Sequence, residues 1–194
     1  MDKTHKTALV SMILNMVFCV YHIVLGIVTH SWWLFTIGIY YVILSFVRAA
    51  VLGNKDDHRA SPKLVGIMLM ILSLPLAGTV ILSFIKDRGT VFHEIVMITI
   101  ALYAFTKITL AIIKWMQSRQ SSSAKVIILK NISLATAFVS IFSLQRSMLV
   151  SFGNMPENTI RIMNLATGSA VCIVVFLLGL NLLKSKKFRI KGKQ

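Results

Sequence analysis

The sequence predicts an all-α integral membrane protein in which six transmembrane helices form two inverted three-helix repeats, with both termini in the cytoplasm. The first observation is the composition: the 194 residues are 56% hydrophobic and 14% charged, more apolar than a soluble core requires. The second is that the apolar residues gather in six long stretches. The third is that the second half of the sequence resembles the first. The length leaves room for a single transmembrane domain over residues 1–194.

The six apolar stretches give the bounds of the expected helices. A spanning helix needs about 20 mostly apolar residues, and each stretch reaches this length. The first stretch is longer than the apolar region of a typical signal peptide, so we expect it to be retained. The expected helices cover 7–28, 31–52, 63–85, 90–116, 124–150 and 159–183. Only Thr29 and His30 separate the first two, which predicts a tight antiparallel hairpin.

The Lys and Arg residues predict the orientation. On the expected topology they divide unequally between the two sides of the membrane, which places both termini inside. The richer side has Lys3, Lys6, Lys55, Arg59, Lys63, Lys114, Arg119, Lys125, Lys130, Lys184, Lys186, Lys187, Arg189, Lys191 and Lys193; the other has Lys86, Arg88 and Arg161. We expect a multi-pass protein of a bacterial cytoplasmic membrane.

The net charge of +15 is distributed in a way that disfavours nucleic-acid binding. The basic residues are expected at helix ends and in the tail 184–194, not on the surface of a soluble domain. We expect this tail to lie on anionic lipid headgroups, with about 1 kcal/mol gained per basic residue near the surface. A protein or nucleic-acid partner for the tail is the less favoured alternative.

An internal similarity predicts the repeat. Residues 43–48 and 141–146 both follow the pattern Ile-x-Ser-apolar-x-Arg, ending in Arg48 and Arg146. Repeat one would cover about 7–85 and repeat two about 90–183. Because each repeat has three helices, the second enters the membrane from the opposite side, and the repeats are inverted. Sites in such proteins lie near the midplane, where the repeats meet.

The first hairpin resembles the start of the cation diffusion facilitator family, which exports divalent metals through six transmembrane helices. The resemblance rests on Asn15, His22 seven residues later, Gly26 four after that, and the segment Thr-His-Ser-Trp-Trp-Leu at 29–34. The rest of the chain resembles the family only in helix count and inverted symmetry. Homodimerisation would fit the resemblance.

The metal-binding chemistry of that family does not carry over. Its His and Asp ligands fall on Tyr40 and Leu44 in the second helix, and on Phe138 and Phe142 in the fifth. These side chains do not bind zinc, which needs nitrogen, sulfur or carboxylate ligands. The expected helices contain no Asp, and we expect no counterpart of the family's cytoplasmic metal-binding domain. We therefore expect a related scaffold with no metal site and no cofactor.

Ionisable residues within a bilayer are functional candidates by default. Lys107 is the deepest charge in the sequence. It either snorkels to the surface or faces the interior, where it pairs with an anion or replaces a coupling cation. Arg48 and Arg146 lie nearer helix ends, so snorkelling is favoured for both; the alternative is a gate at each side. Glu94 would complement a helix N-terminus, and a proton-coupling role is the alternative.

Hydroxyl groups mark two helix faces. Tyr41, Ser45 and Arg48 share one face of the second helix by their spacing. Thr136, Ser140, Ser143 and Ser147 form a stripe on the fifth. The favoured explanation is close helix packing, and the alternative is the wall of a substrate path. The candidate path residues are Lys107, Tyr41, Ser45, Arg48, Ser143, Arg146 and His22. The three tryptophans, Trp32, Trp33 and Trp115, are expected at the membrane interfaces.

Two functions fit these features. The first is a secondary transporter on a cation-efflux-like scaffold with an atypical, non-zinc site for an anionic or neutral solute. The second is a non-transporting membrane protein that acts as a partner subunit, assembly factor or lipid-binding scaffold. An enzyme is disfavoured, because the sequence has no nucleophile–base pair, phosphate-binding glycine loop or metal-ligand cluster.

Overall fold

The computed structural model describes residues 3–53, 62–85, 91–120, 124–152 and 155–184, which form helices and contain no strand. The helices are α1 (Lys3–Val28), α2 (Trp32–Gly53), α3 (Pro62–Ile85), α4 (Glu94–Gln120), α5 (Ala124–Phe152) and α6 (Glu157–Lys184). All six are long and apolar enough to cross a membrane, so the prediction of six such helices is confirmed. Lys55, Arg59, Lys86, Arg88 and the tail after Lys184 lie outside the described residues.

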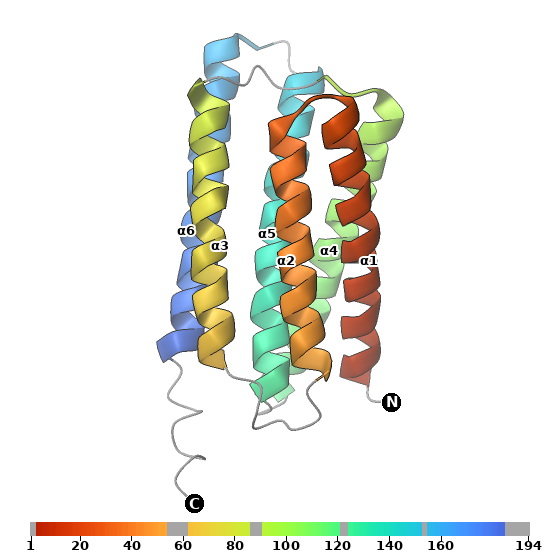
Figure 1. Ribbon diagram of the computed structural model, residues 1–194, viewed down its shortest axis with the longest axis vertical. Helices are drawn as coiled ribbons and strands as arrows, with labels where there is room; N and C mark the ends of the chain where they lie inside the picture. The colour runs from red at the N-terminus through yellow and green to blue at the C-terminus, as the bar shows by residue number, and fades with distance from the viewer. Residues whose placement is uncertain (1–2, 54–61, 86–90, 121–123, 153–154, 185–194) are drawn as a thin grey trace, which may run out of the picture.

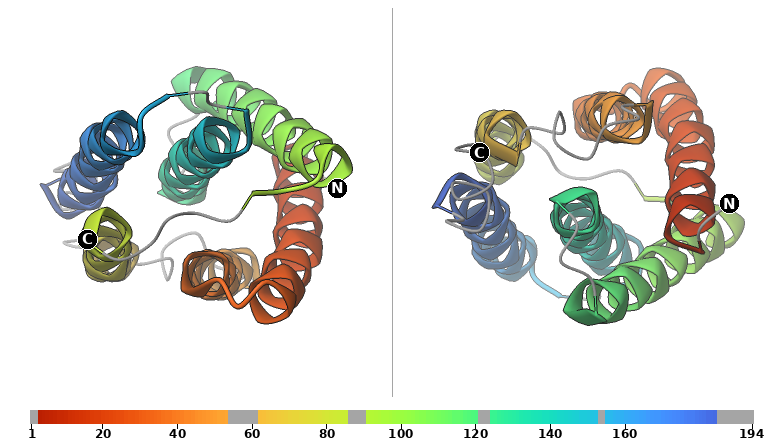
Figure 2. Two further views of the ribbon diagram at one scale, coloured as in Figure 1. Left: turned by 90° about the horizontal axis from the view of Figure 1, so that it is seen from above. Right: turned by 90° about the horizontal axis from the view of Figure 1, so that it is seen from below.

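The helices form a bundle with two parts (Figure 1). We call α1, α2, α4 and α5 the four-helix group; α3 and α6 lie beside it as an antiparallel pair. Seen along the bundle, α5 lies inward of α2, α3, α4 and α6, and it contacts all four (Figure 2). The chain enters α1 and leaves α6 at the same end of the bundle, as an even number of spans requires.

The predicted tight hairpin joins α1 to α2. The Ser31 N–H donates to the Gly26 carbonyl at 2.9 Å, and His30 has a left-handed φ of 49°. Gly26 is needed here, since a Cβ at this position would lie 2.7 Å from the backbone nitrogen of Phe35. The absence of a side chain at residue 26 therefore allows the two helices to pack closely just after the turn.

Glycine also sets the packing of α3 on α6. A Cβ at Gly66 would lie 2.8 Å from the Gly179 carbonyl oxygen, and a Cβ at Gly179 would lie 2.8 Å from that of Gly66. Small residues that face each other let two membrane helices approach backbone to backbone. The α3–α6 pair is thus held by close apolar packing.

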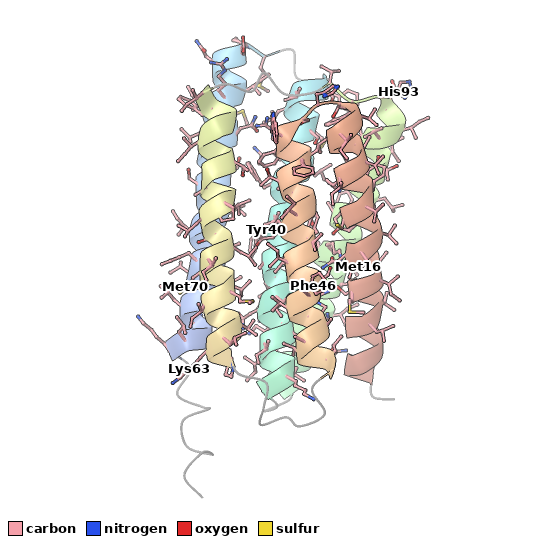
Figure 3. All side chains as sticks on the ribbon, viewed as in Figure 1. Met16, Tyr40, Phe46, Lys63, Met70 and His93 are labelled. Carbon is pink, nitrogen blue, oxygen red and sulfur yellow. The ribbon has the colours of Figure 1, made fainter. Side chains whose placement is uncertain are left out.

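The outer surface of the bundle is apolar along its length. Phe46 on α2 is 65% exposed and Met16 on α1 is 40% exposed, and both are labelled in Figure 3. The same view labels His93 at one end of the bundle and Lys63 at the other. Large apolar side chains on the outside, with polar ones at the ends, are what a lipid environment requires.

Candidate functional site

Three buried basic side chains lie toward one end of the four-helix group. Arg48 of α2 is 0% exposed, and Lys107 and Lys114 of α4 are 2% and 1% exposed. The two lysines are two helical turns apart, so they share a face of α4. We call these three residues the basic cluster. A charge inside a membrane bundle is costly and marks a functional site by default.

Hydrogen bonds tie the basic cluster to neighbouring helices. The Arg48 guanidinium donates to the Ser11 hydroxyl of α1, and to the Ser133 hydroxyl of α5 at 3.1 Å. The Lys107 ammonium donates to the Ser11 carbonyl at 3.1 Å, and to the Asn15 side-chain oxygen. The cluster therefore joins all four helices of the group.

Tyr103 completes the surroundings of Lys107. Its hydroxyl donates to the Asn15 side-chain oxygen at 3.4 Å, and the Lys107 ammonium lies 5.1 Å from the centre of its ring. A cation at this distance is attracted to the face of the ring. The Asn15 oxygen thus accepts from both a cation and a hydroxyl, which fixes its orientation.

The structure shows where the three side chains of the basic cluster face. Lys107 does not snorkel but faces the interior. The expectation that Arg48 snorkels is wrong, because the guanidinium is buried and bonded to Ser11 and Ser133. Lys114 was counted in the sequence only among the basic residues of the cytoplasmic side. It lies within α4, and its side chain is buried and faces the bundle.

No described carboxylate balances the basic cluster. The acidic side chains in the described part of the chain are Glu94 and Glu157, both exposed at the helix ends opposite the cluster. Glu157 pairs with Arg161 at 2.7 Å, and Glu94 lies in the first turn of α4, where the helix dipole favours it. When protonated, the three side chains of the cluster repel one another, because like charges interact strongly where little water screens them.

Several buried donors of this region have no hydrogen-bond partner among the described residues. They are the Arg48 Nε, the Lys114 ammonium and the side-chain nitrogen of Asn15. The buried Ser45 hydroxyl is also without a partner there. Unpaired buried polar groups are rare in folded proteins, so each requires an explanation.

Aromatic and hydroxyl groups continue the polar interior beyond the cluster. The Ser140 hydroxyl donates to the Thr136 carbonyl at 2.8 Å, so at the 3.0 Å contact with Ser140 the Tyr41 hydroxyl is the donor. The Tyr41 ring packs edge-on against His22 and Tyr103, with ring centres 5.6 Å apart in both cases. These contacts bring Tyr41 and His22, two predicted path residues, together in the middle of the group.

The polar interior reaches the other end of the group at Arg146. This guanidinium is buried and lies 4.6 Å from the centre of the Trp33 ring, which packs edge-on against Phe142. The expectation that Arg146 snorkels is therefore wrong. Trp33 is not an interfacial anchor either, because it is 5% exposed, whereas Trp32 and Trp115 are exposed. Ser143 is buried on the same helix, and its hydroxyl has no described partner.

The positions that would hold metal in the cation efflux family are filled by aromatic and aliphatic side chains. Tyr40, Leu44 and Phe142 are buried, and Phe138 is half-buried. Among the described residues there is no group of three His, Cys, Asp or Glu side chains that could hold a metal ion. Only the Tyr40 hydroxyl offers an oxygen here, and a neutral phenol is a poor ligand for zinc.

Sequence reasoning missed part of this site. Ser11, Asn15, Tyr103, Lys114 and Ser133 all line the basic cluster, but none was predicted as a site residue. The spacing of seven between Lys107 and Lys114, and of four between Ser11 and Asn15, placed each pair on one helix face. Which other helix those faces meet is a tertiary property that no spacing gives.

Comparisons of the chain with protein-family models, with curated proteins and with solved structures found no match. The resemblance to the cation diffusion facilitator family accordingly remains a prediction. What the structure itself defines is a bundle of six membrane-length helices with a buried basic cluster.

Proposed function

We propose that this chain is a small secondary transporter that moves an anionic or neutral solute through the interior of the four-helix group. The observation that carries the proposal is the continuity of buried polar groups along α5, from Ser133 through Ser140 to Arg146. At 1.5 Å per residue this line is about 20 Å long, a large part of the hydrocarbon thickness of a bilayer. A helix bundle that only needed to span lipid would not bury so many polar groups.

The pattern of helix contacts supports an inverted repeat. α1 packs on α2 as α4 packs on α5, and α3 packs on α6. The crossing of α2 and α5 at Tyr41 and Ser140 fits a pseudo-twofold axis there. Two turns along α2 lead to Arg48, and two turns back along α5 lead to its partner Ser133. Exchange of the two repeat conformations would open the interior alternately to each side.

The orientation of this transporter follows from the basic residues. With cytoplasmic termini, the basic cluster lies toward the cytoplasm and Arg146 toward the outside. We also propose that the protein lies in a bacterial cytoplasmic membrane, forms a homodimer and has a cation-efflux-like scaffold without a zinc site. Its C-terminal tail would lie on anionic lipid headgroups. A coupling role for Glu94 is not favoured, because this residue is exposed far from the cluster.

Flux measurements test the proposal. Purified protein in liposomes should transport a member of a panel of small anions and neutral solutes, with zinc and manganese included and with or without a pH gradient. Lys107→Met should abolish that flux without unfolding the protein, whereas Lys130→Met, a basic residue of α5 outside the cluster, should not. Full flux by the Lys107 variant would contradict the proposal.

A second function is favoured by one observation, the apolar side chains at all but one of the positions where the resembled family binds metal. A scaffold that has lost such ligands fits a partner subunit, an assembly factor or a lipid-binding protein. Its test is purification in mild detergent from the native membrane. A stoichiometric protein partner, together with absence of flux from folded protein, would replace the transporter by this function.

A further inference from the structure

The basic cluster has the chemistry of an anion site. We propose that Arg48, Lys107 and Lys114 together bind one small oxyanion of the phosphate class, carrying two negative charges. This inference deepens the proposed function by naming a substrate class. The claim that the oxyanion is transported rests on the proposed function, whereas the claim that it binds does not, since binding can be measured separately.

The first argument is charge. Three basic side chains lie together in a membrane bundle, and no described carboxylate lies near them. Burial of an unpaired charge is far more costly than burial of a paired one, because the charge loses its hydration and gains nothing in return. An anion with two charges would offset most of the cost of protonating these side chains and would screen the repulsion among them.

The second argument is the kind of group left unpaired. The Arg48 Nε, the Lys114 ammonium and the Asn15 nitrogen are all hydrogen-bond donors, and all are buried. A set of free donors calls for a ligand rich in acceptors. The unpaired groups nearest in sequence that can accept are the Ser45 hydroxyl, three residues before Arg48, and the Gln117 amide oxygen, three residues after Lys114. Being neutral, these two groups could accept hydrogen bonds but could not balance the charge of the cluster.

The third argument is geometry. The Arg48 guanidinium has five N–H groups; its two terminal nitrogens each donate one bond to a serine hydroxyl, and its Nε has no described partner. Planar guanidinium groups bind phosphate oxygens through two parallel hydrogen bonds, and lysines add point charges. Chloride has one charge and no directed acceptor oxygens, so it should bind more weakly than phosphate.

The same chemistry is present in inorganic phosphate and in the phosphomonoester headgroup of a lipid. The cluster side chains are at most 2% exposed, so either ligand reaches them only when helices of the group separate. Alternating access would provide such an opening. The experiment therefore includes one arm for each source.

The experiment uses the full-length protein in detergent, titrated calorimetrically with inorganic phosphate at constant ionic strength, with chloride as control. Saturable binding of phosphate is expected. Lys114→Met and Arg48→Lys should each weaken it about tenfold to a hundredfold, as loss of a charge-assisted hydrogen bond does. Lys130→Met is the matched control, in which binding should be unchanged.

Thermal melting separates a site from a structural role. Lys114 has no hydrogen bond to a described residue, so Lys114→Met, a substitution of similar length, breaks no hydrogen bond there and removes an unpaired buried amine. The phosphate-free variant should therefore melt at or above the temperature of the unmodified protein, and phosphate should no longer raise its melting temperature. A variant that melts lower and still responds to phosphate would overturn the proposal.

The second arm identifies a lipid ligand. Mass spectrometry of the purified protein should detect a retained phospholipid with a phosphomonoester headgroup if such a headgroup occupies the site, and Lys114→Met should lose it. This result supports the site with a lipid as the source. Binding of neither phosphate nor phospholipid, as expected if the lysines are held neutral, overturns it. Binding of phosphate without flux would support the anion site and contradict the transporter proposal. Flux of another solute without phosphate binding would contradict the anion site and support the transporter proposal.

Discussion

The four-helix group and the α3–α6 pair bury different chemistry. The group encloses four Arg and Lys side chains and lines of hydroxyls, whereas the pair, where its burial is described, encloses only two polar side chains, Ser73 and Asn164. Ser73 donates to the Met70 carbonyl within its own helix. The pair meets instead through glycines. Both parts have to be stable in lipid, but only the group keeps polar groups that lipid and close packing do not require.

This difference indicates that the two parts have different roles. Close glycine packing makes the α3–α6 pair rigid, because backbones in direct contact resist small displacements. A network of hydrogen bonds can exchange partners when helices shift, so the group is the part suited to change. Substitutions in the two parts should therefore differ in their effect on the stability of the protein.

The largest effect is expected in the pair. Gly66→Leu should destabilise the protein by about 3 kcal/mol, because the new side chain meets the Gly179 carbonyl and forces α3 and α6 apart. Gly78→Leu is the matched control on the same helix, since a Cβ there would meet nothing within 4 Å. Unfolding in detergent measures both. Equal losses for the two variants would show that the glycine contact does not hold the pair.

A smaller effect is expected from one substitution made in both parts. Asn15→Leu should cost about 2 kcal/mol, because it removes the acceptor for the Lys107 ammonium and the Tyr103 hydroxyl. Asn164→Leu in α6 should be within about 1 kcal/mol of neutral, since the amide oxygen of Asn164 has no described partner to lose. Thermal melts compare them. If Asn164→Leu were the more harmful, the contrast between the two parts would fail.

The smallest effect concerns the crossing of α2 and α5. A double-mutant cycle on Tyr41→Phe and Ser140→Ala should give a coupling energy of about 0.6–1 kcal/mol, the usual size for hydrogen bonds between membrane helices. The cycle cancels the loss of the separate bond from Ser140 to the Thr136 carbonyl. A coupling energy of zero would mean that the contact adds nothing to the α2–α5 interface.

The helices were predictable from sequence because their apolar length is a local property. The second helix was expected at 31–52 and occupies Trp32–Gly53, and the hairpin before it forms at Thr29 and His30. The hydroxyl stripe of α5 also has a local cause, since a spacing of three and four residues keeps its members on one face. That face is buried, as either explanation of the stripe required.

The site was less predictable, because its members come together from different helices. Arg48 and Arg146 lie near helix ends, where snorkelling is the ordinary outcome. In this chain α5 lies inward, and the serines and aromatic rings around it give both guanidinium groups partners in the interior. Lys114 was missed because it lies close to the end of the expected helix 90–116, where a lysine ordinarily reaches the membrane surface, whereas α4 continues to Gln120 and the side chain is buried.

The inward position of α5 bears on how the protein enters its membrane. This helix is the least apolar and the most buried of the six spans. Its hydroxyl face would insert poorly into lipid alone, since each unsatisfied polar group there costs free energy. During synthesis α1, α2 and α4 precede it, and α2 carries the tyrosine and arginine that its serines contact. Assembly of α5 thus depends on a neighbour already made, which would disfavour independent insertion of the segment from α4 to α6.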